Sequence, residues 1–218
     1  IYAAFFLLIF TNDDFIYETH TIESSFRQYL QKILLKSKRV NTIVISKSLG
    51  NLLNEKYNVS TYKMHVQHDA ARSGLDNLMY EHESNKELLP IKNNYDLKIG
   101  YFGSLLSGRG IEIIEEISRK MPNNIFLVYG PKNQNNEFEE RAKNIESNIF
   151  FGGFLGHKDI HKNMMNCDIL LMPYQKKVSI DKKGSDTSRW MSPMKMFEYL
   201  AAGKPIISSD LPVLREVL

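Results

Sequence analysis

The chain has 218 residues, with 28 Lys and Arg against 25 Asp and Glu, so its formal net charge is +3. This weak positive charge gives no reason to expect a nucleic-acid partner. A single cysteine, Cys167, excludes a disulfide framework and every multi-cysteine metal site. Apolar residues make up 43% and charged residues 24% of the chain, which predicts a globular protein of one or two domains.

Both ends of the sequence interrupt a pattern. Residues 1–10 form an apolar run that is too short to cross a bilayer and lacks the charged start of a signal peptide. We expect this run to form a buried helix. Residues 212–218 look like the beginning of another helix. We therefore interpret the sequence as a piece of a longer protein.

Strand-like and helix-like segments alternate in the first part of the chain. The pattern predicts strands at residues 15–18, 41–45 and 62–66, and helices at residues 23–38 and 47–56. Ser46 is a good N-cap for the second helix. The polar stretch of residues 70–95 predicts a linker, with a domain boundary at residues 90–95.

The second part of the chain is more regular. We predict strands at residues 97–102, 125–129, 148–151, 168–172 and 205–208, and helices at residues 110–120, 136–143, 157–166 and 194–202. Strands that are apolar on both faces and separated by helices are typical of a buried parallel sheet. Ligands of such sheets bind beyond the carboxyl ends of the strands. Here those ends lead into loops that begin at Gly103, Gly130, Gly152, Pro173 and Ser208.

The segment of residues 192–205 carries the clearest chemical signal. Ser192 is the predicted N-cap of a helix, Pro193 suits its first position, and Gly203 suits its end. The free N–H groups of such a helix start favour a phosphate. Lys195 lies in the first turn, where the helix dipole disfavours a cation. A bound anion would account for this lysine.

Glu198 lies one turn beyond Lys195 on the same helix face. Its carboxylate could accept hydrogen bonds from both hydroxyls of a ribose. The predicted buried face of the helix consists of Met196, Phe197, Leu200 and Ala201. The alternative interpretation is a capped core helix with a local Lys195–Glu198 pair, and spacing alone does not choose between the two.

Residues 103–110 form a glycine-rich turn between a predicted strand and helix, which is a second candidate anion site. The glycine spacing nearly matches a P-loop. However, Arg109 stands where Lys is needed, and Gly110 stands where Ser or Thr would bind Mg²⁺. The turn also lacks the spacing of a dinucleotide fingerprint. It predicts phosphate binding without a magnesium ligand; a plain tight turn is the alternative.

Histidines mark two other strand ends. His20 ends the first predicted strand, where it is either catalytic or structural. His65, His68 and Asp69 follow one another near the end of a later strand. Their spacing is unlike that of a metal site, and a further ligand is not evident, so we predict no metal.

Together these segments resemble the retaining glycosyltransferases of family 4, which have the GT-B fold. The resemblance rests on residues 17–20, 103–110 and 167–173 and, most specifically, on the helix segment of residues 192–205. It implies an α/β fold with two Rossmann-like domains and parallel sheets. Residues 1–90 would be the last part of an incomplete acceptor-side domain with its linker. Residues 91–218 would be a nucleotide-sugar-binding domain that is truncated at its end.

The resemblance also implies a function. Such an enzyme transfers a hexose-type sugar from a nucleoside diphosphate sugar to a glycan or lipid-linked acceptor, with retention and without a metal or other cofactor. It implies polysaccharide biosynthesis in the cytoplasm, and leaves open a peripheral contact with the inner membrane face through missing parts. The piece alone is expected to be inactive. A non-catalytic nucleotide-sugar-binding module and a nucleotide-sugar 2-epimerase on the same fold are the alternatives.

Individual residues take roles from this resemblance. His20, Arg109 and Lys195 would be catalytic, with the two cations stabilising the leaving diphosphate. Glu198 matches the ribose ligand, the second Glu of the family's Glu-x(7)-Glu motif. Further donor contacts are expected from Gly103, Ser104, Gly130, Pro131, Ser192, Pro193 and Met194.

Two positions depart from the family pattern. Trp190 stands where the first Glu of the motif would fall, and Ser104 stands where a basic residue is usual. Lys195 is the candidate to supply the missing charge. The sugar contacts of the absent Glu remain unassigned, with Asp186 as a candidate.

Overall fold

The computed structural model describes residues 1–71, 95–132, 134–143, 148–179 and 185–218. The chain divides into two compact units. The first unit contains Ile1–Asp69, Thr187–Ser192 and Leu211–Leu218, and the second contains Ala70–Asp186 and Pro193–Asp210. The predicted domain boundary at residues 90–91 and most of the predicted linker lie outside the described residues.

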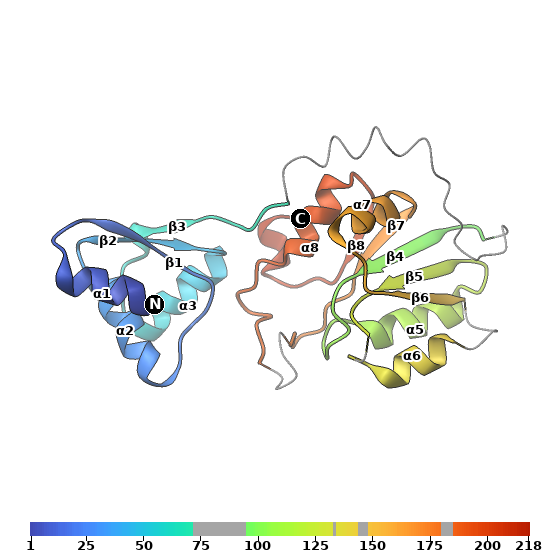
Figure 1. Ribbon diagram of the computed structural model, residues 1–218, viewed down its shortest axis with the longest axis horizontal. Coiled ribbons are helices and arrows are strands. Elements are labelled where there is room, and N and C mark those ends of the chain that lie inside the picture. Colours follow the sequence, from blue (N-terminus) through green and yellow to red (C-terminus); the bar gives the residue numbers. More distant parts are fainter. Residues whose placement is uncertain (72–94, 133, 144–147, 180–184) are drawn as a thin grey trace. The chain divides into compact units, whose positions relative to one another are not determined.

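The sheet of the first unit has the parallel strand order β1-β2-β3, with β1 (Phe15–Thr19), β2 (Val40–Val44) and β3 (Met64–Val66) (Figure 1). Its helices are α1 (Tyr2–Phe10), α2 (Ser25–Lys36) and α3 (Lys47–Tyr57), with a short 3-10 turn η1 (Thr61–Lys63) before β3. Every predicted strand and helix of this part of the chain is present, with shifted ends.

The beginning of α3 follows the prediction from sequence. Ser46 is its N-cap, and its hydroxyl accepts a hydrogen bond from the Leu49 N–H at 3.0 Å. This satisfies one of the N–H groups that a helix start leaves without a partner. Leu49 and Leu53 on α3 then pack with Val44 and Leu34 in the fully buried core of the first unit.

The prediction that residues 1–10 form a buried helix is wrong in one respect. The residues do form α1, but none of them is buried. Ile1, Ala4 and Leu8 face the core, whereas Phe6 and Phe10 on the other side are 58% and 68% exposed. The run is apolar all round, so its pattern does not indicate which side packs against the core. Within the described part of the chain, no helix is long and apolar enough to cross a membrane.

The helix expected at residues 212–218 is also shorter than predicted. A single 3-10 turn, η3 (Leu214–Glu216), forms there and packs in the first unit. The Glu216 carboxylate accepts hydrogen bonds from the Lys47 and Ser48 N–H groups at the beginning of α3. These contacts hold the end of the chain by a side chain rather than by a regular helix.

The second unit has a five-stranded parallel sheet in the order β6-β5-β4-β7-β8. Its strands are β4 (Lys98–Phe102), β5 (Ile125–Tyr129), β6 (Ile149–Gly153), β7 (Ile169–Met172) and β8 (Ile206–Ser208). Its helices are α5 (Ile111–Lys120), α6 (Asn136–Ala142), α7 (His157–Met165) and α8 (Met194–Ala201). Figure 1 shows α5 and α6 on one face of this sheet and α7 and α8 on the other.

Both faces of the second sheet are covered, as the apolar strands predicted. On β4, Ile99 and Tyr101 join the cluster that contains Ile111 and Ile114 of α5. The alternate residue Phe102 faces the other way, where its ring meets the ring of Tyr199 on α8. This alternation is the two-residue period of a strand. The sheet is therefore a rigid central layer whose carboxyl edge carries the loops.

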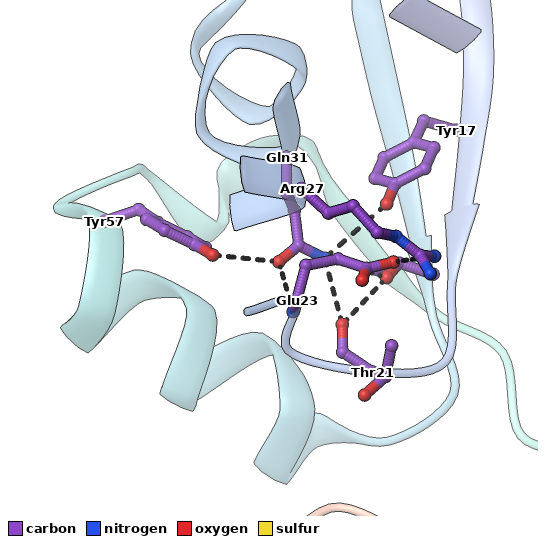
Figure 2. Close-up of polar contacts among 7 residues, drawn as sticks. Tyr17, Thr21, Glu23, Arg27, Gln31 and Tyr57 are labelled. Carbon is purple, nitrogen blue, oxygen red and sulfur yellow. Dashed lines mark hydrogen bonds and ion pairs between the residues drawn. The ribbon is translucent and has the colours of Figure 1, made fainter. Parts of the chain in front are cut away.

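A buried polar network fixes the loop that follows β1 (Figure 2). Gln31 of α2 is fully buried and uses both ends of its amide. Its oxygen accepts hydrogen bonds from the Glu23 N–H at 2.9 Å and the Tyr57 hydroxyl at 3.0 Å. Its nitrogen donates to the Thr21 carbonyl at 2.9 Å and the Thr19 hydroxyl at 3.1 Å. One side chain thus holds a loop that has no regular backbone pairing.

We expect Gln31→Leu to lower the free energy of unfolding by about 2–4 kcal/mol, because it leaves several buried polar groups without a partner. Urea denaturation followed by Trp190 fluorescence measures this loss. Trp190 is the one tryptophan of the chain and packs against the core of the first unit.

The matched control is Gln28→Leu on the same helix, because Gln28 is half-buried and takes part in none of these hydrogen bonds. It should change the free energy of unfolding by less than about 1 kcal/mol. Equal losses in the two variants would show that the network does not stabilise the unit.

Candidate functional site

The candidate site lies where the connections of the second sheet reverse direction. From β4 the chain proceeds through α5 to β5 on one side, and β7 is the neighbour of β4 on the other side. In parallel α/β sheets this arrangement opens a crevice at the carboxyl ends of the two diverging strands. The residues that follow β4 and β7 are the glycine-rich turn of residues 103–110 and the segment that begins at Pro173.

The glycine-rich turn is tied to the segment after β7 by backbone hydrogen bonds. Gln175 and Ser179 donate their N–H groups to the carbonyls of Gly108 and Ser107 at 2.9 and 3.1 Å. Gly110 has a φ of +87°, and a Cβ there would lie 1.9 Å from the Pro173 carbonyl oxygen. A side chain at this position is therefore excluded on two grounds. The glycine pattern thus builds a close contact between two backbone segments.

Helix α8 begins one residue later than the sequence suggested. The N-cap is Pro193, and the helix runs from Met194 to Ala201. Pro193 is in an extended conformation and accepts a hydrogen bond from the Met196 N–H at 2.9 Å. The hydroxyl of Ser192 instead accepts a 3.0 Å hydrogen bond from the Asp69 N–H within the first unit. The prediction of Ser192 as N-cap is therefore wrong, because this hydroxyl has another donor.

The buried face of α8 also differs from the prediction. Met196 and Tyr199 are fully buried, whereas Leu200 is 46% exposed and Ala201 is exposed too. The hydroxyl of Tyr199 accepts a hydrogen bond from the Phe102 N–H at 2.9 Å. Burial raises the pKa of Tyr199 well above 10, so this phenol stays neutral. Tyr199 thereby fixes α8 to the last residue of β4.

Lys195, from the first turn of α8, lies at the centre of the candidate site. The residue is 9% exposed. Its side chain crosses Gly103, where a Cβ would lie 2.7 Å from both Cε and Nζ of the lysine. Nζ is 3.7 Å from the centre of the Tyr101 ring and 5.3 Å from that of Tyr174. In the described part of the chain it has no hydrogen-bond acceptor.

The surroundings of Lys195 disfavour its charged form. Burial lowers the pKa of Lys195 well below 10.5, and the neighbouring Arg109 lowers it further. The negative charge of Glu198 raises the pKa of Lys195, but this effect is the weakest of the three. The described structure shows no ion pair between Glu198 and Lys195. A buried cation without a hydrogen-bonded counterion is costly for a fold. An anion bound at Nζ would remove this cost.

Arg109 is half-buried in the turn and is held in a fixed orientation. Its Nη1 donates to the Tyr174 hydroxyl at 3.1 Å, and its Nε donates to the Ser179 carbonyl at 3.1 Å. A guanidinium has five N–H groups, so donors remain for a ligand. Burial raises the pKa values of Tyr101 and Tyr174, which keeps both phenols neutral beside the two basic side chains.

The other expected donor-site residues surround this centre on the same sheet edge. The Ser104 hydroxyl accepts a hydrogen bond from the Leu106 N–H. The Ser104 carbonyl accepts a hydrogen bond from the Tyr101 hydroxyl. Gly130 directly follows β5, and a Cβ there would lie 2.3 Å from the Gly103 carbonyl oxygen. Pro131 follows it and is half-buried. The structure therefore brings together the turn, the end of β5 and the beginning of α8.

Glu198 and Met194 present accessible groups on α8. The side chain of Met194 is 54% exposed. Glu198 is half-buried, and its carboxylate accepts no hydrogen bond from the described residues. It lies one helical turn from Lys195. A free carboxylate acceptor and a buried amine are thus one turn apart on one helix.

The histidines belong to the first unit. His20 follows β1 as an exposed side chain, with Nε2 2.7 Å from Glu18 Oε1. His68 lies with Nδ1 2.9 Å from the Ile45 carbonyl oxygen. Among the residues that the structure describes, no group of three or more His, Cys, Asp or Glu side chains is arranged to hold a metal ion.

Sequence reasoning missed the two tyrosines that line the site. Tyr101 lies in β4 two residues before Gly103, and Tyr174 directly follows Pro173 after β7. Their positions beside predicted strand ends were the available signal. Trp190, which replaces the expected Glu, packs against the core of the first unit. An apolar contact thus explains the indole at this position.

A comparison with known families identifies a match over most of the second unit. The sequence pattern of the family described as glycosyl transferases group 1 matches residues 97–218. One curated protein, TuaH from Bacillus subtilis (strain 168), is 29% identical over 114 residues. It is named as a glycosyltransferase of teichuronic acid biosynthesis. The match covers 52% of this chain and 27% of TuaH, so the chain spans about a quarter of that relative.

Solved structures share the fold. A glycosyltransferase from Rickettsia africae superimposes with a TM-score of 0.67 and 17% identity, over 99% of this chain and 57% of that one. HepE from Anabaena, solved with UDP and glucose, superimposes with a TM-score of 0.65 and 16% identity, over 99% and 58%. These similarities confirm the predicted α/β fold of GT-B type with parallel sheets.

The buried ammonium makes a prediction for stability. We expect Lys195→Met to raise the free energy of unfolding by about 1–4 kcal/mol at pH 7, because methionine keeps the volume and removes the cost of enclosing a lysine amine that is protonated in the unfolded chain. The lowered pKa means that the unfolded chain binds more protons than the folded chain below pH 10.5. The free energy of unfolding of the unmodified protein should therefore rise with pH. The difference between Lys195→Met and the unmodified protein should become smaller.

Chemical denaturation followed by circular dichroism, at several values between pH 7 and pH 9.5, measures this difference. Lys120→Met is the control, since Lys120 is exposed at the end of α5 and forms an exposed pair with Glu116. It should change stability by less than about 1 kcal/mol without a pH trend. A Lys195→Met variant that is less stable at every pH would contradict the prediction.

Proposed function

Because the chain belongs to the glycosyl transferases group 1 family, we propose that its second unit binds a nucleoside diphosphate sugar for transfer of the sugar to an acceptor. The proposal includes retention of configuration and independence of metal ions. We propose a glycan or lipid-linked acceptor and a cytoplasmic location, consistent with the polysaccharide synthesis in the name of the Bacillus relative.

One observation supports the donor site above the others. Lys195 Nζ is buried without an acceptor in the described chain, above the glycine at which the β4 turn begins. The fold tolerates this cost at a strand end where α/β proteins bind ligands. A diphosphate would supply acceptor oxygens and negative charge to Nζ, to the free N–H groups of Arg109 and to the start of α8.

The same cations suggest how the transfer step is assisted. As the bond between the sugar and the diphosphate breaks, negative charge grows on the diphosphate oxygens. Fixed donors aimed at those oxygens stabilise the transition state more than the ground state. Arg109 is held in position by Tyr174 and Ser179 before any ligand arrives. It therefore needs little reorganisation during the reaction.

Glu198 and His20 complete the proposed assignment. Glu198 is one turn from Lys195 and has a free carboxylate, which suits the two hydroxyls of a ribose attached to the diphosphate. We assign His20 to the transferred sugar on the basis of the family resemblance. Its exposed ring would be available for such a contact.

Nucleotide binding tests the proposed donor site directly. We expect the 218-residue chain to bind one of UDP, GDP and ADP saturably in a calorimetric titration, with the same affinity in EDTA. UDP is the first nucleotide to test, since the Anabaena protein of the same fold was solved with it. Glu198→Ala should weaken binding, whereas Glu116→Ala, on the exposed surface of α5, should not.

Two results would count against this assignment. A folded chain that binds none of the three nucleotides would refute the donor site. Binding that appears only after Mg²⁺ is added would refute metal independence.

Arg109 allows a second test with a matched control. Arg109→Ala should weaken nucleotide binding about 10- to 100-fold, since it removes a charge-assisted hydrogen bond of about 1.5–3 kcal/mol. Arg119→Ala changes the exposed arginine at the other end of α5 and should leave the affinity unaltered. Circular dichroism would show whether both variants keep their fold. Equal affinities of the two folded variants would exclude a role for Arg109 in phosphate binding.

A further inference from the structure

We propose that Lys195 is a neutral amine when the site is empty and an ammonium when a diphosphate is bound, so that donor binding takes up one proton from solution. This inference rests on the proposed donor site and adds a property that such a site does not require. A lysine that is charged in both the empty and the occupied site would bind the same ligand without taking up a proton.

The geometry of the empty site carries the argument. Nζ of Lys195 lies 3.7 Å from the centre of the Tyr101 ring and 5.3 Å from the centre of the Tyr174 ring. The lysine side chain passes over Gly103. An ammonium has three N–H donors, and in the described structure none of them finds an acceptor. The ring contact with Tyr101 replaces only a part of the lost hydration.

The titratable and charged groups around Lys195 come from four segments. They are Tyr101 on β4, Arg109 in the turn after β4, Tyr174 after β7, and Glu198 and Tyr199 on α8. The phenols of Tyr101, Tyr174 and Tyr199 are neutral because burial raises their pKa values. Arg109 stays positive at every relevant pH. Glu198 is the one carboxylate of this group, and it forms no ion pair with the lysine.

The balance of these charges therefore favours the neutral amine. A permanent positive charge on Arg109 and the positive end of the α8 dipole both oppose a second cation. Burial acts in the same direction and lowers the pKa of Lys195 well below 10.5. The amine gives up one proton and retains two N–H donors with a lone pair.

A bound diphosphate reverses this balance. Its oxygens bring negative charge and hydrogen-bond acceptors to Nζ, which stabilises the protonated form. The step is R–NH₂ + H⁺ → R–NH₃⁺, and the proton comes from water or buffer. No bond of the donor breaks in this step. Between the pKa values of the empty and occupied sites, the affinity should fall tenfold for each unit of rising pH.

Titration calorimetry measures the proton directly. The same nucleotide, whichever of UDP, GDP and ADP binds, is titrated at each of several pH values in two buffers of different ionisation enthalpy. The difference in heat gives the number of protons exchanged. Above about pH 8 the terminal phosphate, with a pKa of about 6, is already fully ionised, so protons must go to the protein. We expect uptake that approaches one proton for each nucleotide bound.

Lys195→Arg is the matched variant, because arginine keeps its charge in the empty site. It should bind the nucleotide without proton uptake and without the tenfold dependence on pH. If this variant does not fold, the dependence of the unmodified protein's affinity on pH decides alone, and a flat profile between pH 7.5 and about 9.5 overturns the proposal.

The outcomes separate the two levels of inference. Nucleotide binding with uptake of one proton supports both the donor site and the neutral lysine. Binding without proton uptake, or equal uptake by folded Lys195→Arg, overturns the neutral lysine and leaves the donor site standing. Absence of binding by the folded, unmodified chain overturns both.

Discussion

The cost of enclosing the Lys195 side chain is the constraint on which the rest of the second unit depends. The residue is 9% exposed, and its amine is buried and reaches no acceptor in the described chain. The enclosure requires a glycine at position 103, because a Cβ would overlap the lysine. It also requires that α8 start in one place, which the hydrogen bond between Phe102 and Tyr199 secures. The close approach at Gly103 and the Phe102–Tyr199 hydrogen bond thus keep the Lys195 amine in a position where it is poorly solvated.

The sheet explains why such a group can be held there. The strand order places β4 between β5 and β7, and the chain leaves β4 and β7 in different directions. Backbone N–H groups and side chains from the turn after β4, the segment after β7 and the start of α8 therefore meet at one edge. The apolar packing on both faces of the sheet fixes their spacing. The position of the site is a consequence of topology, and its charge is a consequence of Arg109 and Lys195.

Local signals predicted the fold well where one physical rule decided the outcome. Ser46 caps α3 as expected, because its hydroxyl accepts the Leu49 N–H and can still donate to its distant partner, the Trp190 carbonyl. Ser192 carried the same signal but accepts a hydrogen bond from Asp69, 123 residues away in the sequence, which no local pattern reveals. The packing of α1 was likewise hidden, because an apolar run has no polar side to orient it. The tyrosines around Lys195 were missed because aromatic residues near strand ends usually belong to the core.

One departure from the family pattern, Ser104, has a counterpart on α8. Ser104 leaves the β4 turn without a basic residue after its first glycine, and Lys195 reaches across Gly103 to that place from another element. A cation carried on α8 is fixed relative to Glu198 by the geometry of one helical turn, whereas a cation in the turn would be positioned independently of it. In the proposed donor site, one helix would therefore present a cation for the phosphates and a carboxylate for the ribose hydroxyls of the same nucleotide.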